Sequence, residues 1–182
     1  MNLFEEQLDF EYLYDGRVVR LRRDNALLPN GNTAIREVVE HNGGVCVAAL
    51  TDNDELLFVR QFRYPYGEVV LEIPAGKRDS IDEDPFECGR RELKEETGAI
   101  ASNYIFLGEL YPSPGYCSEI IWLYAATGLT FGETDLDDDE FLNVEKIPFE
   151  KAVDMVLSGE IKDAKTQTAI LKVKLLKDKG KI

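Results

Sequence analysis

Hydrophobic and polar positions alternate in short runs along the first third of the chain, and this pattern predicts β-strands. Turn-forming residues interrupt the runs at Pro29 to Asn32 and again at Thr51 to Asp54, so two hairpins are predicted. A further short strand leads into Pro74, Ala75 and Gly76. The predicted strands of this part are 16–28, 33–40, 45–50, 56–62 and 69–73.

The pattern changes to a helical period after Asp84. Asp84 is suited to cap the helix N-terminus, Pro85 to occupy the first position, and Glu87 to complete a capping box. Gly98 provides a stop signal, so we expect a helix over 85–97. At 100° per residue, one stripe of this helix would pack and the neighbouring stripe would display three carboxylates. The packing stripe contains Phe86, Gly89, Leu93 and Thr97, and the acidic stripe contains Glu92, Glu95 and Glu96.

The remaining elements alternate between strands and helices. β-like runs are predicted at 104–111, 120–126 and 141–146, and helical patterns at 149–157 and 164–176. The first two of these strands are separated by Pro112 to Gly115, and an acidic run from Asp135 to Glu140 precedes the third. This order predicts the α/β class, with a mixed sheet and helices on its faces.

Composition limits the classes of function. The chain has 182 residues and 44% hydrophobic residues, which fits one soluble globular domain, and no apolar run reaches the length of a membrane span. The first residues do not resemble a signal peptide, so we expect a cytoplasmic protein. The formal net charge of −14 argues against a nucleic-acid polymer as partner but leaves small anionic substrates open, provided that metal ions attract them.

Few residue types are available for chemistry other than carboxylates. Cys46, Cys88 and Cys117 form no CxxC pair, which argues against a disulfide framework and a thiolate zinc site. His41 is the only histidine, so a Ser-His-Asp triad has almost no material. Oxygen ligands favour hard cations, and Mg²⁺ or Mn²⁺ therefore fits better than zinc.

The acidic stripe has two interpretations. Like charges three or four residues apart destabilise a helix by roughly 0.2–0.5 kcal/mol per pair, and a divalent cation between them would reverse that sign. A solvated acidic face is the plain alternative. The residues around the stripe favour a metal site.

Gly76, Glu83 and the run from Arg91 to Gly98 closely resemble the signature box of the Nudix hydrolases. Two departures are visible: six residues rather than five separate Gly76 from Glu83, and Ala99 stands where a larger aliphatic residue is usual. The resemblance implies an α/β/α sandwich with a mixed sheet over 42–182. It also implies that Arg91 pairs with a carboxylate, for which Glu83 is the candidate.

The lead-in from Val59 to Tyr64, followed by Glu72 to Gly76, is similar to the ADP-ribose pyrophosphatase group of this family. Pro114 lies sixteen residues after Gly98, at the offset that marks the group. The resemblance implies Mg²⁺-dependent hydrolysis of ADP-ribose to AMP and ribose 5-phosphate. It also implies that the N-terminal β-hairpin region, 1–41, contributes to a homodimer interface.

The resemblance further implies roles for single residues. Glu92 and Glu96 would bind metal, Glu95 would share or bridge ions, and the backbone carbonyl of Ala75 would reach a metal. Glu140 is the candidate for a further metal or water contact, and Asp138 is a possible base; which carboxylate acts, Glu95 included, is open. For the glutamates, the plain alternative is an exposed helix charge.

Arg36 and Arg63 are candidates for phosphate contacts, because the guanidinium fork suits that geometry. By resemblance, Glu119 would touch the distal ribose of the substrate. Pro114, shortly before it in the sequence, is a further substrate-binding candidate. Ordinary surface charges remain the alternative for these residues. Two other functions stay open: hydrolysis of another nucleoside diphosphate derivative, such as a nucleotide sugar or a dinucleotide, and a non-catalytic domain that binds a nucleotide.

Overall fold

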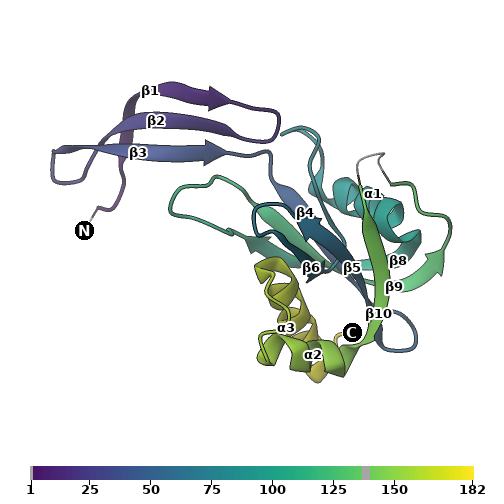
Figure 1. Cartoon of the computed structure of the whole chain (residues 1–182). Coiled ribbons are helices and arrows are strands. Elements are labelled where there is room, and N and C mark those ends of the chain that lie inside the picture. Colours follow the sequence, from purple (N-terminus) through teal and green to yellow (C-terminus); the bar gives the residue numbers. More distant parts are fainter. Residues whose placement is uncertain (1, 137–139) are drawn as a thin grey trace. The chain divides into compact units, whose positions relative to one another are not determined.

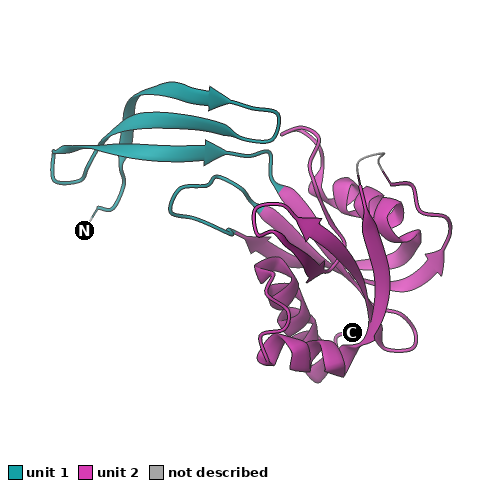
Figure 2. Cartoon of the chain, viewed as in Figure 1, with its two compact units in different colours: residues 1–43, 111–120 teal, residues 44–110, 121–182 magenta. Residues whose placement is uncertain are grey.

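The computed structural model describes residues 2–136 and 140–182, which group into two compact units (Figure 2). Unit 1 comprises Met1–Gly43 and Tyr111–Ile120, and unit 2 comprises Gly44–Leu110 and Ile121–Ile182. The sequence suggested a boundary after residue 41. The structure adds the segment that contains Pro114 to the N-terminal unit.

Unit 1 is a three-stranded antiparallel sheet in the order β1-β2-β3 (Figure 1). Its strands are β1 (Glu6–Asp15), β2 (Arg20–Leu27) and β3 (Thr33–Glu40). The hairpin predicted around Pro29 to Asn32 is confirmed by the pairing of β2 with β3, and β1 extends it on the other edge of β2. The segment Tyr111–Ile120 is attached by main-chain hydrogen bonds, from Val39 to the Tyr116 carbonyl at 2.7 Å and from Ser118 to the Val39 carbonyl at 2.9 Å.

Unit 2 contains two sheets and three helices within its described residues, 44–110, 121–136 and 140–182. The four-stranded sheet has the order β7-β4-β9-β8 and is mixed, because β4 and β9 are parallel whereas the other pairs are antiparallel. Its strands are β4 (Gly44–Ala49), β7 (Ala75–Lys77), β8 (Ala99–Leu110) and β9 (Ile121–Phe131). The three-stranded sheet, in the order β10-β5-β6, contains β5 (Glu55–Arg63), β6 (Glu68–Glu72) and β10 (Leu142–Pro148). The helices are α1 (Pro85–Thr97), α2 (Phe149–Leu157) and α3 (Ala164–Asp178).

The fully buried strand β4 separates two hydrophobic clusters. Side chains alternate across a strand, so Cys46 and Ala48 join the cluster formed with α2 and α3, while Val47 and Ala49 join the one that contains Leu93 of α1. Helices therefore cover both faces of the mixed sheet, as Figure 1 shows. The predicted α/β/α sandwich is confirmed. Within the described residues, no helix has the length and apolarity needed to cross a membrane.

Helix α1 begins and ends where its capping residues predict. The Asp84 side chain accepts hydrogen bonds from the main-chain N–H groups of Phe86 and Glu87, at 2.9 and 3.1 Å. The Glu87 side chain does not complete the expected capping box among the described residues, because it pairs with Arg90 on the helix surface. Gly98 adopts φ 68°, which a residue with a side chain rarely adopts, and its N–H donates to the Lys94 carbonyl. These ends fix the position of the acidic stripe.

Candidate active site

Two of the three carboxylates on the acidic stripe of α1 are buried. Glu92 is 9% exposed and Glu96 is 3% exposed, whereas Glu95 is only partly covered. Leu93, on the packing stripe, is completely buried in the core beneath them. A buried carboxylate is costly unless it is paired or binds a metal, so a solvated acidic face does not describe Glu92 and Glu96.

Strand β7 lies directly against these carboxylates. The Ala75 N–H donates to Glu96 Oε2 at 2.9 Å. A Cβ atom at position 76 would lie 1.9 Å from Cδ of Glu92, so only glycine leaves room for that side chain. The loop and helix of the sequence motif thus meet, and the main chain at Ala75 and Gly76 forms one wall around the carboxyl groups.

Arg91 connects the acidic residues on its side of the helix. Its Nη1 lies 2.8 Å from Glu92 Oε1 and 2.9 Å from Glu95 Oε2, and its Nη2 lies 3.2 Å from Glu83 Oε1. The expected pair with Glu83 is therefore confirmed. The guanidinium group offsets part of the repulsion among these carboxylates.

The loop with the additional residue retains a defined conformation. Nε of Arg78 donates to the Glu83 carbonyl at 2.7 Å, and its guanidinium lies over the Trp122 ring at 4.9 Å from the centroid. Glu83 Oε2 accepts a hydrogen bond from the Asp79 N–H at 2.7 Å. The six-residue spacing thus still brings Glu83 to Arg91.

Burial and mutual repulsion disfavour the charged forms of Glu92 and Glu96. Burial raises the pKa of Glu92 to about 7, and the charges of Glu95 and Glu140 add to this although Arg91 opposes it. Burial raises the pKa of Glu96 to about 8, with further contributions from Glu92 and Glu140, while the bond from Ala75 opposes it. Glu140 is thus electrostatically coupled to both buried carboxylates.

The chemistry of these residues fits a divalent cation. All the candidate donors are oxygens, and their repulsion is what a 2+ ion would remove. Within residues 2–136 and 140–182, no three acidic, histidine or cysteine side chains form a ready coordination shell. In this conformation Nη1 of Arg91 donates hydrogen bonds to one carboxylate oxygen of Glu92 and one of Glu95.

Arg63 forms an ion pair that the sequence did not predict. It forms a two-pronged ion pair with Glu72, from Nε to Oε1 at 2.6 Å and from Nη2 to Oε2 at 2.7 Å. The hydrogen bond to Glu72 is the main cause of the raised pKa of Arg63, and the Glu96 charge makes the smallest of the contributions. Glu72 and its second partner, Lys165, were not among the predicted site residues, because a salt bridge between residues 93 positions apart leaves no local pattern.

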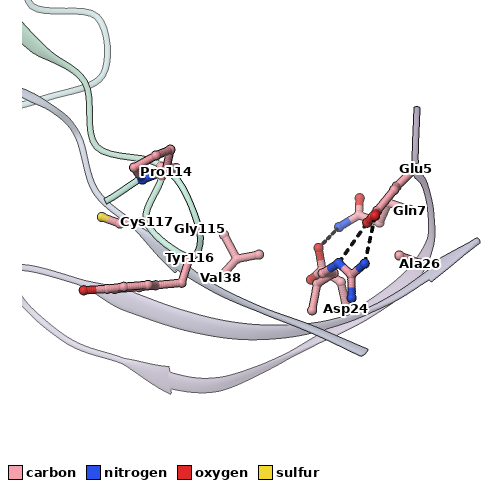
Figure 3. A pocket seen from close by; sticks show the side chains of 11 residues that line it. Glu5, Gln7, Asp24, Ala26, Val38, Pro114, Gly115, Tyr116 and Cys117 are labelled. Atoms are coloured by element: carbon pink, nitrogen blue, oxygen red, sulfur yellow. Dashed lines mark hydrogen bonds and ion pairs between the residues drawn. The ribbon is translucent and has the colours of Figure 1, made fainter. Parts of the chain in front are cut away.

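Arg36 and Pro114 line a pocket within unit 1 of about 270 Å³ (Figure 3). Arg36 pairs with Glu5 through two hydrogen bonds of 2.8 Å, and Gln7 donates to Asp24 at 2.7 Å. Figure 3 shows Pro114, Gly115 and Tyr116 on the loop side of the pocket. The other lining residues are Ala26, Val38, Cys117 and Ser118. The pocket therefore combines charged strand residues with a loop main chain.

The other predicted residues are distributed as follows. Glu119 lies in unit 1, with Oε1 3.5 Å from Nδ1 of His41. Glu140 is half-buried and directly precedes Phe141 and strand β10. Asp138 lies outside the described residues.

Comparisons with known proteins agree with this geometry. The NUDIX domain model matches residues 33–168. The chain is 40% identical to the "Methanol dehydrogenase activator" of Bacillus methanolicus over 92% of both chains. It is 39% identical to the "ADP-ribose pyrophosphatase" of Bacillus subtilis (strain 168), over 93% of this chain and 92% of the relative. A crystal structure of an "ADP compounds hydrolase" has the same fold, with a TM-score of 0.85 and 24% identity over 100% of both chains.

Proposed function

Because the chain belongs to the family of Nudix hydrolases, we propose that it uses Mg²⁺ to hydrolyse the diphosphate bond of ADP-ribose, giving AMP and ribose 5-phosphate. The observation that supports this most is the buried pair Glu92 and Glu96 against Ala75 and Gly76. The name of the Bacillus subtilis relative supports ADP-ribose as the substrate.

In this proposal, Glu92, Glu95, Glu96 and Glu140 bind Mg²⁺ together with the carbonyl of Ala75; Mn²⁺ is the alternative. The bound ion supplies charge neutralisation at the phosphoryl oxygens and polarises water. A carboxylate takes the proton of the attacking water, and the candidates are Glu140, Glu95 and Asp138. The water oxygen forms the new bond to phosphorus as the bond to the bridging oxygen breaks, and two monophosphates leave.

Substrate contacts are proposed for four further residues. Arg63 presents Nη1, the guanidinium nitrogen not engaged with Glu72, for a phosphate. Arg36 and Pro114, which line the pocket of unit 1, and Glu119 are further candidates for nucleotide contacts. Arg36 donates to Glu5 from Nε and Nη2 and to the Ile35 carbonyl from Nη1, so it would have to exchange Glu5 for the substrate.

The test is AMP release from ADP-ribose with Mg²⁺ by the wild type, Glu96→Gln and Glu87→Gln. Glu87 lies on the same helix, but its only ion-pair partner in the described part of the chain is Arg90 at the surface, so it is the matched control. We expect Glu96→Gln to lower kcat by at least about 10–100-fold, because the variant weakens metal binding, and Glu87→Gln to change it by less than about twofold. Equal turnover by all three proteins would contradict the carboxylate mechanism.

GDP-mannose, NADH and a nucleoside triphosphate serve as comparison substrates. Preferred turnover of one of these, lost in Glu96→Gln, would keep the mechanism and assign another nucleoside diphosphate derivative. Tight binding of ADP-ribose without turnover of any of these compounds would contradict hydrolysis and would support a non-catalytic, nucleotide-binding domain.

A second candidate function follows from the relative named "Methanol dehydrogenase activator", because its identity of 40% covers nearly the whole chain. Here the chain would stimulate a dehydrogenase. The test is the rate of a purified methanol dehydrogenase with wild type or Glu96→Gln. Stimulation by the wild type alone would link activation to the hydrolytic site, and no stimulation would remove this candidate.

We also propose a cytoplasmic homodimer that uses the sheet of unit 1. Large apolar side chains on β1 are exposed, among them Leu8, Phe10 and Leu13, and such patches mark contact surfaces. The three cysteines are all unpaired, which suits a reducing compartment.

A further inference from the structure

Four charged side chains join the ends of β5 and β6 to the beginning of α3. Glu72, which is 2% exposed, accepts both prongs of Arg63 and also an ion pair from Lys165. Lys165, whose side chain is 13% exposed, pairs in turn with Asp163 at 3.0 Å. Two positive and two negative charges therefore balance one another, and all but Arg63 are largely shielded from water.

The same helix end also binds the main chain next to Glu72. Asp163 caps α3 by accepting from the Thr166 N–H at 2.9 Å, and it accepts from Thr166 Oγ1 at 2.6 Å. Thr166 Oγ1, fully buried, then accepts from the Ile73 N–H at 3.0 Å. The beginning of α3 thus fixes both the side chain of Glu72 and the backbone that continues to Ala75, whose N–H donates to Glu96.

The geometry points to Lys165 as a positioning residue that sets the orientation of the Arg63 guanidinium toward the substrate diphosphate. This inference rests on the proposed function, because it takes Arg63 as a phosphate contact. Lys165 and Nη2 of Arg63 both donate to the same oxygen, Oε2 of Glu72. Lys165 therefore fixes the Glu72 carboxylate, and the two-pronged pair transmits that orientation to the guanidinium plane.

Arg63 is placed to benefit from this arrangement. Glu72 occupies Nε and Nη2, so Nη1 is the guanidinium nitrogen that has no hydrogen-bond partner among the described residues. If Lys165 is lost, Arg63 is the one cation left to Glu72 among the residues that the structure describes, and the carboxylate can rotate about the side-chain bonds. The Nη1 edge then loses its fixed direction although Arg63 keeps its charge.

The first readout is the kinetics of Lys165→Met with ADP-ribose. The matched control is Lys162→Met, which removes an exposed ion pair with Glu68 of the same strand but does not touch Glu72. We expect Lys165→Met to lower kcat/KM about 10–100-fold, the range for residues that orient a ligand-binding side chain, with Lys162→Met unchanged. In an Arg63→Gln background, Lys165→Met should have no further effect. Independent, multiplying effects would show a purely structural role and overturn the inference.

The second readout does not depend on activity. The Arg63 Nε–H correlation in a ¹H–¹⁵N spectrum is assigned by its loss in Arg63→Gln. We expect it to shift and broaden in Lys165→Met and to stay in place in Lys162→Met. An unchanged signal in folded Lys165→Met overturns the inference. If the wild type proves not to hydrolyse ADP-ribose, the proposed function fails, and this spectrum still decides whether Lys165 orients Arg63.

A third variant covers the case in which Lys165→Met does not fold. Asp163→Asn keeps a good helix cap but removes the negative partner of Lys165. The same two readouts then apply, with a smaller shift of the Arg63 signal and a smaller loss of kcat/KM expected. No change in either would overturn the inference.

Discussion

At position 76, the space for a side chain is already taken by the carboxyl group of Glu92. A Gly76→Ala substitution must therefore displace Glu92. Because displaced metal-site residues commonly cost 10–100-fold in affinity, we expect Mg²⁺ binding to weaken by about that factor. The control is Gly132→Ala, where the nearest atom to a new Cβ lies 3.8 Å away. Mg²⁺ titration by calorimetry checks this; equal affinities of the two variants would contradict the placement of Glu92 at the metal.

Glu72 gives a pH-dependent contribution to stability. Burial raises its pKa, but the ion pairs with Arg63 and Lys165 outweigh this, so the pKa in the folded chain lies below the usual 4.5. The unfolded chain thus takes up this proton first as the pH falls. The stabilisation is complete above about pH 4.5 and is lost as the pH falls through the folded pKa.

The corresponding measurement compares urea unfolding of wild type and Glu72→Gln between pH 3 and 7. At pH 7 we expect the variant to be less stable by about 3 kcal/mol, because the largely buried Lys165 and the partly exposed Arg63 lose the carboxylate that they share. The difference should shrink below pH 4.5. A difference that stays constant over the whole range would show that the ionised carboxylate contributes nothing.

The two capped helices of unit 2 differ in what their caps support. Asp84 satisfies only N–H groups of α1, whereas Asp163 also binds Thr166 Oγ1 and Lys165. We expect Asp84→Ala to lower the free energy of unfolding by about 1 kcal/mol and Asp163→Ala to lower it by more than 2 kcal/mol. Urea unfolding of both variants provides the test. Equal losses would mean that Asp163 acts as a simple cap.

Local sequence signals made helix α1 predictable, whereas contacts between residues far apart in the sequence could not be predicted. Asp84, Pro85 and Gly98 determine the helix from within their own segment, and the family motif correctly paired Arg91 with Glu83. The strand β1 was not predicted as a separate element, although Leu8, Phe10 and Tyr12 alternate with acidic residues. All of its residues are exposed, so no buried face fixes its pairing from the sequence. The contact of Lys165 with Glu72 depends on how α3 packs, which no spacing in the chain records.

At the scale of the whole molecule, the segment Tyr111–Ile120 interrupts unit 2 in sequence and belongs to unit 1. It is attached there by main-chain bonds on both sides of Val39 and helps to line the pocket. Chain connectivity therefore couples the candidate substrate loop to the sheet of β1, β2 and β3. A partner molecule that binds this sheet would also contact the unit that contains Arg36 and Pro114.

The proposed homodimer can be tested with one charge placed on each unit. Leu8 on β1 and Ile100 on β8 are equally exposed, at 49%, so Leu8→Glu and Ile100→Glu change the surface to the same extent. We expect the wild type and Ile100→Glu to sediment as dimers, and Leu8→Glu to shift toward monomer because a carboxylate would have to be buried in the interface. A monomeric wild type would contradict the dimer. If Leu8→Glu remains a dimer and Ile100→Glu becomes a monomer, the interface lies on unit 2 instead of unit 1. ADP-ribose turnover by the monomeric variant would then show that one chain supplies all the residues that the reaction needs.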